Sequence, residues 1–294
     1  MKKFLGILLS LVMVFSLVAC GGKTANDNVN QNANQAKTVA EKVAETTAAK
    51  APEVELVVFA AASMTETMNE IKGLYEAKNP NIKITYNFDS SGTLLKQILA
   101  GAPCDLFISA AQKQMNQLDS SKGEDVNPDK NDFVLQGTRV NLLENKVALA
   151  VPDGNPKGIE KFTDLTTDKL SLLAIGNSDV PVGSYTLEIL IYLGTSAEEL
   201  EKAGKITYGS NVKEVTTQVK EGTVDAGVIY ATDAKSANLK VVDLATKDMC
   251  KQVIYPAAVL NITKNELESK KFLDYLNTAD AMNVFESVGF AKAN

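Results

Sequence analysis

Four short stretches of small and polar residues share one layout, in which a predicted strand ends and a predicted helix begins. They are residues 60–63, 89–93, 180–184 and 209–212. A helix N-terminus presents unpaired backbone N–H groups and a partial positive charge, so it can bind an anion without a basic side chain. Small residues let the backbone approach such an ion closely. If the four turns converge, they form a site of neutral donors suited to a compact, fully deprotonated oxyanion.

Helix capping offers a simpler explanation for each of these turns. Ser63 with Glu66, and Asn211 with Glu214, have the spacing of a capping box, which needs no ligand. Capping is the better interpretation of any single turn, whereas four such turns in one chain favour an anion site. Spacing alone does not establish that the turns converge.

The composition argues against catalysis and against nucleic-acid binding. Among the 294 residues there is no histidine, the usual general base and the commonest transition-metal ligand. The net charge is −6 and Arg139 is the single arginine, so a basic surface for nucleic acid is not expected. Residues 210–213 fit the S-x-x-K pattern of penicillin-recognising enzymes, but the partner motifs are missing. We therefore predict a protein that is not an enzyme, with no catalytic residue, no cofactor and no metal held directly by its side chains.

The N-terminus has the features of a bacterial lipoprotein signal. Met1 is followed by two lysines, an apolar run over residues 4–19, and Cys20. The tetrapeptide LVAC at residues 17–20 resembles a lipobox, so residues 1–20 are predicted to be a signal peptide with lipidation at Cys20; the alternative is a plain signal peptide with an accidental cysteine. Residues 21–53 are polar and predict a disordered tether. We expect a protein anchored by lipid to the outer face of the bacterial cell membrane.

Alternating strands and helices follow the tether. The predicted strands are residues 54–61, 82–88, 105–110, 146–152, 171–176, 226–231, 240–244 and 254–260. Buried helical stripes are predicted for two sets of residues, first Met64, Met68, Ile71 and Tyr75, then Val212, Val215 and Val219. The pattern predicts an α/β protein of two lobes, each a mostly parallel sheet flanked by helices. For Cys104 and Cys250, buried free thiols are the simpler interpretation, and a disulfide between them stays open.

A series of motifs carries a resemblance to a known family. In order they are VVFAAASMTETMNEI, NFDSSGTLLKQILAGAPCDLFISAAQKQM, DVPVGSY, SNVKEV, DAGVIYATDA and YPAAVL. Together they resemble the periplasmic molybdate-binding proteins, which have the type II periplasmic-binding-protein fold, over nearly all of residues 54–290. The motifs are specific as a series, and none of them is specific alone.

The resemblance implies a binding site and its ligand. It assigns Ser63 and Ser91 as hydroxyl and main-chain donors, Val182 and Val212 as main-chain donors, and Tyr230 as a phenolic donor to molybdate or tungstate. Without the resemblance, Tyr230 is more typical of a half-buried core tyrosine. Asp89 is expected to point out of the cleft, with its side chain bonded within the turn.

The resemblance also implies an organisation and a role. Lobe one is predicted to comprise residues 54–143 plus 235–294, and lobe two residues 144–234. The protein would capture the oxyanion between the lobes, as a monomer, and deliver it to the membrane permease and ATPase of an ABC importer. The alternatives are a binding protein for sulfate, another small oxyanion or a small organic anion, and a purely structural scaffold.

Overall fold

The computed structural model describes residues 52–293, which belong to one compact unit. The predicted signal peptide, Cys20 and nearly all of the predicted tether lie outside these described residues. Within residues 52–293, no helix has the length and apolar character needed to cross a membrane. Two separate sheets with helices on their faces confirm the predicted two-lobed α/β fold.

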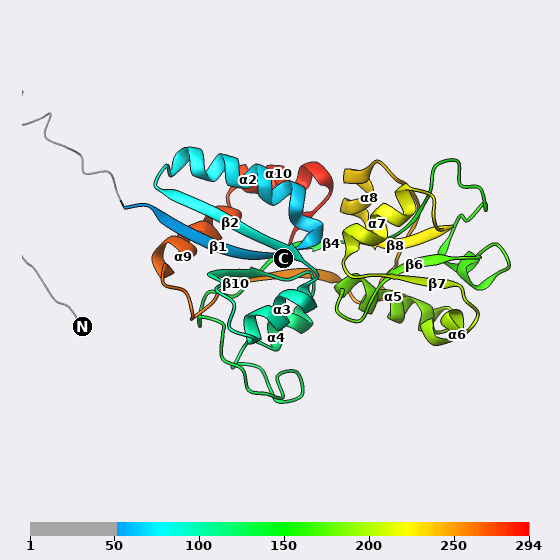
Figure 1. Cartoon of the computed structure of the whole chain (residues 1–294), viewed down its shortest axis with the longest axis horizontal. Helices are drawn as coiled ribbons and strands as arrows, with labels where there is room; N and C mark the ends of the chain where they lie inside the picture. The colour runs from blue at the N-terminus through cyan, green and yellow to red at the C-terminus, as the bar shows by residue number, and fades with distance from the viewer. Residues whose placement is uncertain (1–51, 294) are drawn as a thin grey trace, which may run out of the picture. The chain divides into compact units, whose positions relative to one another are not determined.

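The first lobe is built on a six-stranded sheet with the order β11-β4-β10-β3-β1-β2. Its strands are β1 (Val54–Ala61), β2 (Ile82–Asp89), β3 (Leu106–Ile108), β4 (Val140–Asn145), β10 (Val253–Val259) and β11 (Ala291–Lys292). One face is covered by α2 (Thr65–Lys78) and α10 (Ala279–Val288), and the other by α3 (Ser91–Leu99) and α4 (Gln112–Asn116) (Figure 1). The remaining helix, α9 (Glu266–Leu276), packs against β10.

The second lobe is built on a five-stranded sheet with the order β7-β6-β8-β5-β9. Its strands are β5 (Val147–Val151), β6 (Leu173–Gly176), β7 (Ile206–Gly209), β8 (Ala226–Tyr230) and β9 (Lys240–Leu244). The helices are α5 (Pro181–Tyr192) and α6 (Ala197–Lys202) on one side and α7 (Val212–Lys220) and α8 (Ala231–Ala237) on the other, with a 3₁₀ turn, η2 (Phe162–Thr166), after β5 (Figure 1).

Two crossings join the lobes. β4 runs directly into β5, with one residue between them. The chain returns between β9 and β10, because β9 pairs with β5 in the second sheet. This return lies after Leu244, later than the predicted position at residue 235. The first strand after each crossing, β5 or β10, runs antiparallel to both of its neighbours, while β1 and β6 pair in parallel with theirs. Both sheets are therefore mixed, and the prediction of mostly parallel sheets is wrong, because a strand that enters from the other lobe does not follow a helical crossover within its own sheet.

Apolar periodicity explains most of the elements. All five residues of β5 and all five of β8 are buried, as expected for central strands covered on both faces. Both predicted helical stripes are confirmed as buried, although Met64 belongs to a 3₁₀ turn rather than to the helix. Cys104 is buried and Cys250 is half-buried, and both are free thiols.

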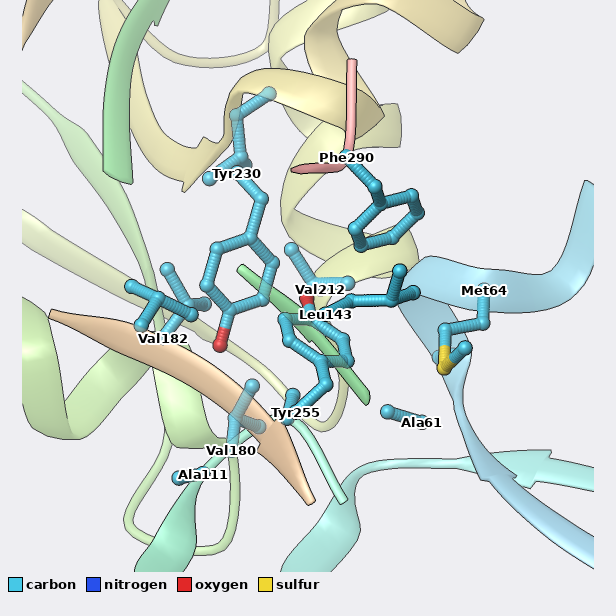
Figure 2. Close-up of a cluster of buried hydrophobic side chains, with 14 of the residues drawn as sticks. Ala61, Met64, Ala111, Leu143, Val180, Val182, Val212, Tyr230, Tyr255 and Phe290 are labelled. Carbon is cyan, nitrogen blue, oxygen red and sulfur yellow. The ribbon is translucent and has the colours of Figure 1, made fainter. Parts of the chain in front are cut away.

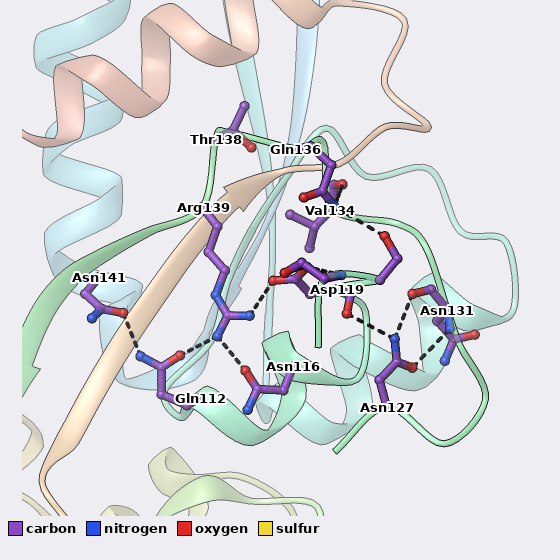
Figure 3. Close-up of polar contacts among 12 residues, drawn as sticks. Gln112, Asn116, Asp119, Asn127, Asn131, Val134, Gln136, Thr138, Arg139 and Asn141 are labelled. Carbon is purple, nitrogen blue, oxygen red and sulfur yellow. Dashed lines mark hydrogen bonds and ion pairs between the residues drawn. The ribbon is translucent and has the colours of Figure 1, made fainter. Parts of the chain in front are cut away.

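The single arginine lies in a polar network of the first lobe, with residues on and after α4 (Figure 3). Arg139 Nη1 donates to Asp119 Oδ2 at 2.7 Å, and Nη2 donates to the side-chain oxygens of Gln112 and Asn116. Burial alone would raise the pKa of Asp119, but hydrogen bonds from Ser121 and Arg139 outweigh it and lower the pKa. Arg139 therefore serves the fold of this lobe.

Replacing Arg139 by alanine tests this structural role. The change leaves the nearly buried Asp119 carboxylate and two amide oxygens without their donor, so we expect a loss of about 2–3 kcal/mol in the free energy of unfolding. Lys130→Ala, which removes an exposed ion pair with Glu124, is the control and should cost little. Urea unfolding of both variants measures the difference. A loss below about 0.5 kcal/mol for Arg139→Ala would contradict the assignment.

Candidate anion-binding site

A small pocket lies where the helix starts of the two lobes meet. It is lined by Ala61, Ala62, Ser63, Asp89, Ser90, Ser91 and Ala110 of the first lobe, and by Val180, Pro181, Val212 and Tyr230 of the second. Its cavity volume is about 10 Å³, roughly the space of one water-sized sphere. Pockets for drug-sized ligands measure roughly 300–1,000 Å³, so this one is suited to a small ion.

The pocket brings together four of the five predicted binding residues. Ser63, Ser91, Val212 and Tyr230 line it, whereas Val182 does not, although its neighbour Pro181 does. Each of the four predicted strand-to-helix turns contributes at least one residue to the lining. The turns therefore converge, which spacing in the sequence could not establish.

Ser63 is held by a partner from a distant strand. It belongs to a 3₁₀ turn, η1 (Ala62–Met64), and its Oγ lies 2.8 Å from the Oη of Tyr255 on β10. The 3₁₀ turn delays the start of α2 to Thr65, and this helix has no side-chain cap. The capping interpretation with Glu66 is therefore wrong for Ser63, because the helix begins one residue later than that box requires and its N-cap position is Met64.

Ser91 is the first residue of α3 and is fully buried. Its Oγ accepts a hydrogen bond from the backbone N–H of Ala110 at 2.9 Å. The helix is capped instead by Ser90, whose Oγ accepts from the N–H of Thr93. Since a serine hydroxyl has one proton and accepts through its lone pairs, the proton of Ser91 stays available for a ligand.

Backbone donors come from the first turns of α5 and α7. Val212 is the first residue of α7, and Asn211 caps this helix by accepting from the N–H of Glu214, as predicted. In α5 the first residue is Pro181, which has no N–H, and no side chain caps the helix. The N–H groups of Val182 and Val212 lie in the first turn, where no carbonyl group of the same helix can accept their hydrogen bonds.

Tyr230 contributes a buried hydroxyl that lacks a protein partner. It ends β8 with 1% of its surface exposed, and among residues 52–293 its Oη makes no hydrogen bond. Its ring packs edge to face on Tyr255, and its oxygen points toward Val180 and Val182 (Figure 2). Burial, and then the nearby Tyr255, raise the pKa of Tyr230 well above its usual value, so the phenol keeps its proton. An unpaired buried hydroxyl costs about 1–3 kcal/mol, which a bound acceptor would recover.

The charges around the pocket are sparse. Of the described residues, no lysine or arginine lines it, and the charged residue that does is Asp89. The Asp89 carboxylate is bonded within the turn, as predicted, where Oδ1 accepts from the N–H of Ser90 at 2.7 Å. The prediction that Asp89 points out of the cleft is not supported, because Asp89 lines the pocket. In this part of the chain no group of three His, Cys, Asp or Glu side chains is placed to hold a metal ion. The site consequently offers neutral donors.

Direct contacts between the lobes border the pocket. The N–H of Gly92 donates to the backbone oxygen of Asp179 at 2.9 Å, and Lys96 pairs with the carboxylate of Asp179 at 2.6 Å. On α7, Lys213 pairs with Glu66 of the first lobe at 2.7 Å. These contacts define a closed arrangement of the two lobes.

Gly92 permits this closed arrangement because it has no side chain. A Cβ atom at this position would lie 2.4 Å from the backbone oxygen of Asp179 and 2.8 Å from its Cα. Both are backbone atoms that a rotamer change cannot move. Gly92 thus has two roles, because it lies in the first turn of α3 and also lets the two lobes come into contact.

Sequence reasoning did not identify Asp233 as a feature of this region. Asp233 lies in the first turn of α8 and is fully buried, 3.2 Å from Lys213 Nζ. Burial raises its pKa to about 6, although Lys213 acts in the opposite direction. A polar residue three positions after a buried strand is common at helix starts, so the sequence carried no signal of its burial.

A larger pocket lies along the two crossings. It is lined by residues 144–147 and 244–247, by residues 250–253, and by Gly289 and Ala291. None of the predicted binding residues lies there. The convergence of helix starts and free hydroxyls, rather than size, identifies the smaller pocket as the candidate site.

The fold is that of a two-lobed binding protein with a small pocket between its lobes, and comparison with known proteins agrees with this class. A family model described as "Bacterial extracellular solute-binding protein" matches residues 56–291. The chain therefore belongs to the bacterial extracellular solute-binding proteins.

Individual relatives narrow the comparison. The putative ABC transporter substrate-binding lipoprotein YvgL of Bacillus subtilis is 36% identical over 239 residues, which cover 81% of this chain and 86% of that protein. The molybdate-binding protein ModA of Escherichia coli is 35% identical over 250 residues, covering 82% and 91%. A solved structure, the substrate binding domain of a putative molybdenum ABC transporter from Clostridium difficile, is 34% identical with a TM-score of 0.61, covering 82% and 100%.

The raised pKa of Asp233 predicts a pH dependence of stability. Its folded pKa of about 6 lies above the ordinary 3.8, so the folded protein binds more protons than the unfolded chain between these values. Stability from this group is therefore lost as pH rises from about 4 to 6 and changes little above that. Unfolding free energies of the wild type and Asp233→Asn, measured from pH 4 to 8, should show the wild type losing stability relative to the variant in this window. A relative gain across the same window would contradict the burial argument.

Proposed function

We propose that this protein captures molybdate or tungstate in the pocket between its lobes and delivers the anion to an ABC importer. The observation that carries the proposal is the buried hydroxyl of Tyr230, which has no partner among the described residues and faces a pocket shared with two serines. The relationship to a molybdate-binding protein of Escherichia coli supports the choice of ligand.

The donor set favours an anion that arrives without protons. Ser63, Ser91 and Tyr230 supply hydroxyls, and the starts of α5 and α7 supply the N–H groups of Val182 and Val212. Phosphate near neutral pH keeps a proton, and a site of donors leaves that proton unsatisfied at a cost of about 1–3 kcal/mol. Molybdate, tungstate and sulfate lack that proton, so the size of the closed pocket must separate sulfate from the larger anions.

Closure of the lobes follows from the position of the donors on both of them. An anion that bridges Ser63 and Ser91 to Val212 and Tyr230 binds the closed form better than the open form and so shifts the equilibrium toward closure. No bond in the ligand is made or broken. In the proposal the closed monomer docks on the permease, whose ATPase drives import, and lipidation of Cys20 keeps it at the membrane. The lipoprotein name of the Bacillus subtilis relative supports this anchor.

Calorimetric titration with molybdate, tungstate, sulfate and phosphate tests the proposed ligand. We expect binding of molybdate and tungstate, weaker binding of sulfate, and none of phosphate. Ser91→Ala removes one hydrogen bond to a charged ligand and should weaken molybdate binding about 10- to 100-fold. Ser287→Ala, an exposed serine on α10, is the control and should bind as the wild type does. The absence of heat with every tetrahedral anion would leave the purely structural role.

Gly92→Ala tests closure separately from the donors. The added methyl group collides with the backbone of Asp179 only when the lobes are closed, so molybdate affinity should fall at least about 10-fold. Alanine is the better helix former, by about 0.5–1 kcal/mol, so the stability of the ligand-free protein should not fall. Gly73→Ala on α2, where a Cβ meets nothing within 4 Å, is the matched control. Unchanged affinity in Gly92→Ala would contradict binding through the closed arrangement.

A further inference from the structure

A chain of buried hydrogen bonds connects the pocket to the first crossing. The Oη of Tyr255 lies 2.8 Å from Ser63 Oγ, and Asn145 Nδ2 donates to the same Oη at 3.2 Å. Asn145 Nδ2 also donates to Thr232 Oγ1 at 2.9 Å. Asn145 is the last residue of β4 and Thr232 lies on α8, so the chain extends from the pocket wall through the crossing into the second lobe. All four residues are buried.

The direction of these hydrogen bonds follows from the groups involved. The Nδ2 of Asn145 is a donor only, so the Oη of Tyr255 must accept from it. The phenol has one proton, and Ser63 Oγ is the only acceptor within hydrogen-bonding distance of it in the described part of the chain. By distance either hydroxyl could donate, and donation by Tyr255 is the direction that leaves its buried proton with an acceptor. The lone pair of Ser63 on that side is then used, and its own proton is free to point elsewhere.

We infer that Tyr255 is a positioning residue, which donates to Ser63 Oγ and thereby turns the Ser63 proton toward the bound anion. The inference rests on the proposed function, since it assigns a task to a residue behind the same pocket. Without Tyr255, the Ser63 hydroxyl has no fixed direction and must be ordered when the anion binds.

Two further observations support this role for Tyr255. Burial, and then the nearby Asp233, raise the pKa of Tyr255 well above its usual value, so the phenol keeps the proton that it must donate. Its ring packs edge to face on Tyr230 and on Phe290 (Figure 2). Phenylalanine at this position would keep both ring contacts and remove only the hydroxyl.

A double-mutant cycle distinguishes positioning from a general structural effect. Molybdate affinity is measured by calorimetry for the wild type, Tyr255→Phe, Ser63→Ala and the double variant. We expect Tyr255→Phe to weaken binding about 3- to 10-fold in the wild type, and less than about 2-fold when Ser63 is already alanine. Tyr86→Phe, which removes another buried hydroxyl outside the pocket, is the matched control and should leave affinity unchanged.

The possible outcomes separate the two claims. If the wild type binds molybdate and Tyr255→Phe binds equally well, or loses the same factor in the Ser63→Ala background, the positioning role is overturned while the proposed function stands. If the wild type binds no oxyanion, the proposed function and this inference both fail. Asn145→Ala provides a second cycle with Ser63→Ala. It removes the group that donates to the Tyr255 hydroxyl and leaves the Tyr255 ring unchanged, so it should show the same coupling.

Discussion

A doubly charged anion buried without a protein cation can be held only if every donor around it points inward. In this pocket two hydroxyls are directed by a hydrogen bond that they accept, and the third has no competing protein partner. Ser91 accepts from the backbone of Ala110, Ser63 lies against Tyr255, and Tyr230 has no partner among residues 52–293. Donors ordered before binding cost no reorganisation when the ligand arrives, which is how neutral groups can compensate for the hydration that a dianion loses.

The fold provides this arrangement by ending strands of both sheets at the same place. Helix starts after β1 and β2 supply one wall, and those after β6 and β7 supply the other, so each lobe alone offers only part of the proposed donors. Closure completes the set, and it requires close backbone contact between Gly92 and Asp179. The ion pair of Lys96 with Asp179 is largely exposed and contributes little. In the proposal, an anion held by donors of both lobes adds to the contacts between them.

Much of this could be predicted from the sequence because apolar runs and small-residue turns are local signals. Eight strands and four helix starts follow from them, and four of the five expected residues share the pocket. The 3₁₀ turn at Ser63 could not be predicted, nor could Tyr255, which is 192 positions away and looks like any strand tyrosine. β4 was missed because the polar residues that end it interrupt the apolar run into β5, and the short strands β7 and β11 were missed as well. The return crossing was placed too early, at residue 235, because the sequence does not show that β9 pairs with β5 in the second sheet.

A crystal structure of the protein with bound molybdate tests the central claim most directly. The account predicts one tetrahedral anion in the small pocket, with its oxygens about 2.6–3.0 Å from Ser63 Oγ, Ser91 Oγ and Tyr230 Oη and near the N–H groups of Val182 and Val212. No lysine, arginine or metal ion should touch it. An anion bound in the larger pocket along the crossings, or one paired with a cation between the lobes, would contradict the account.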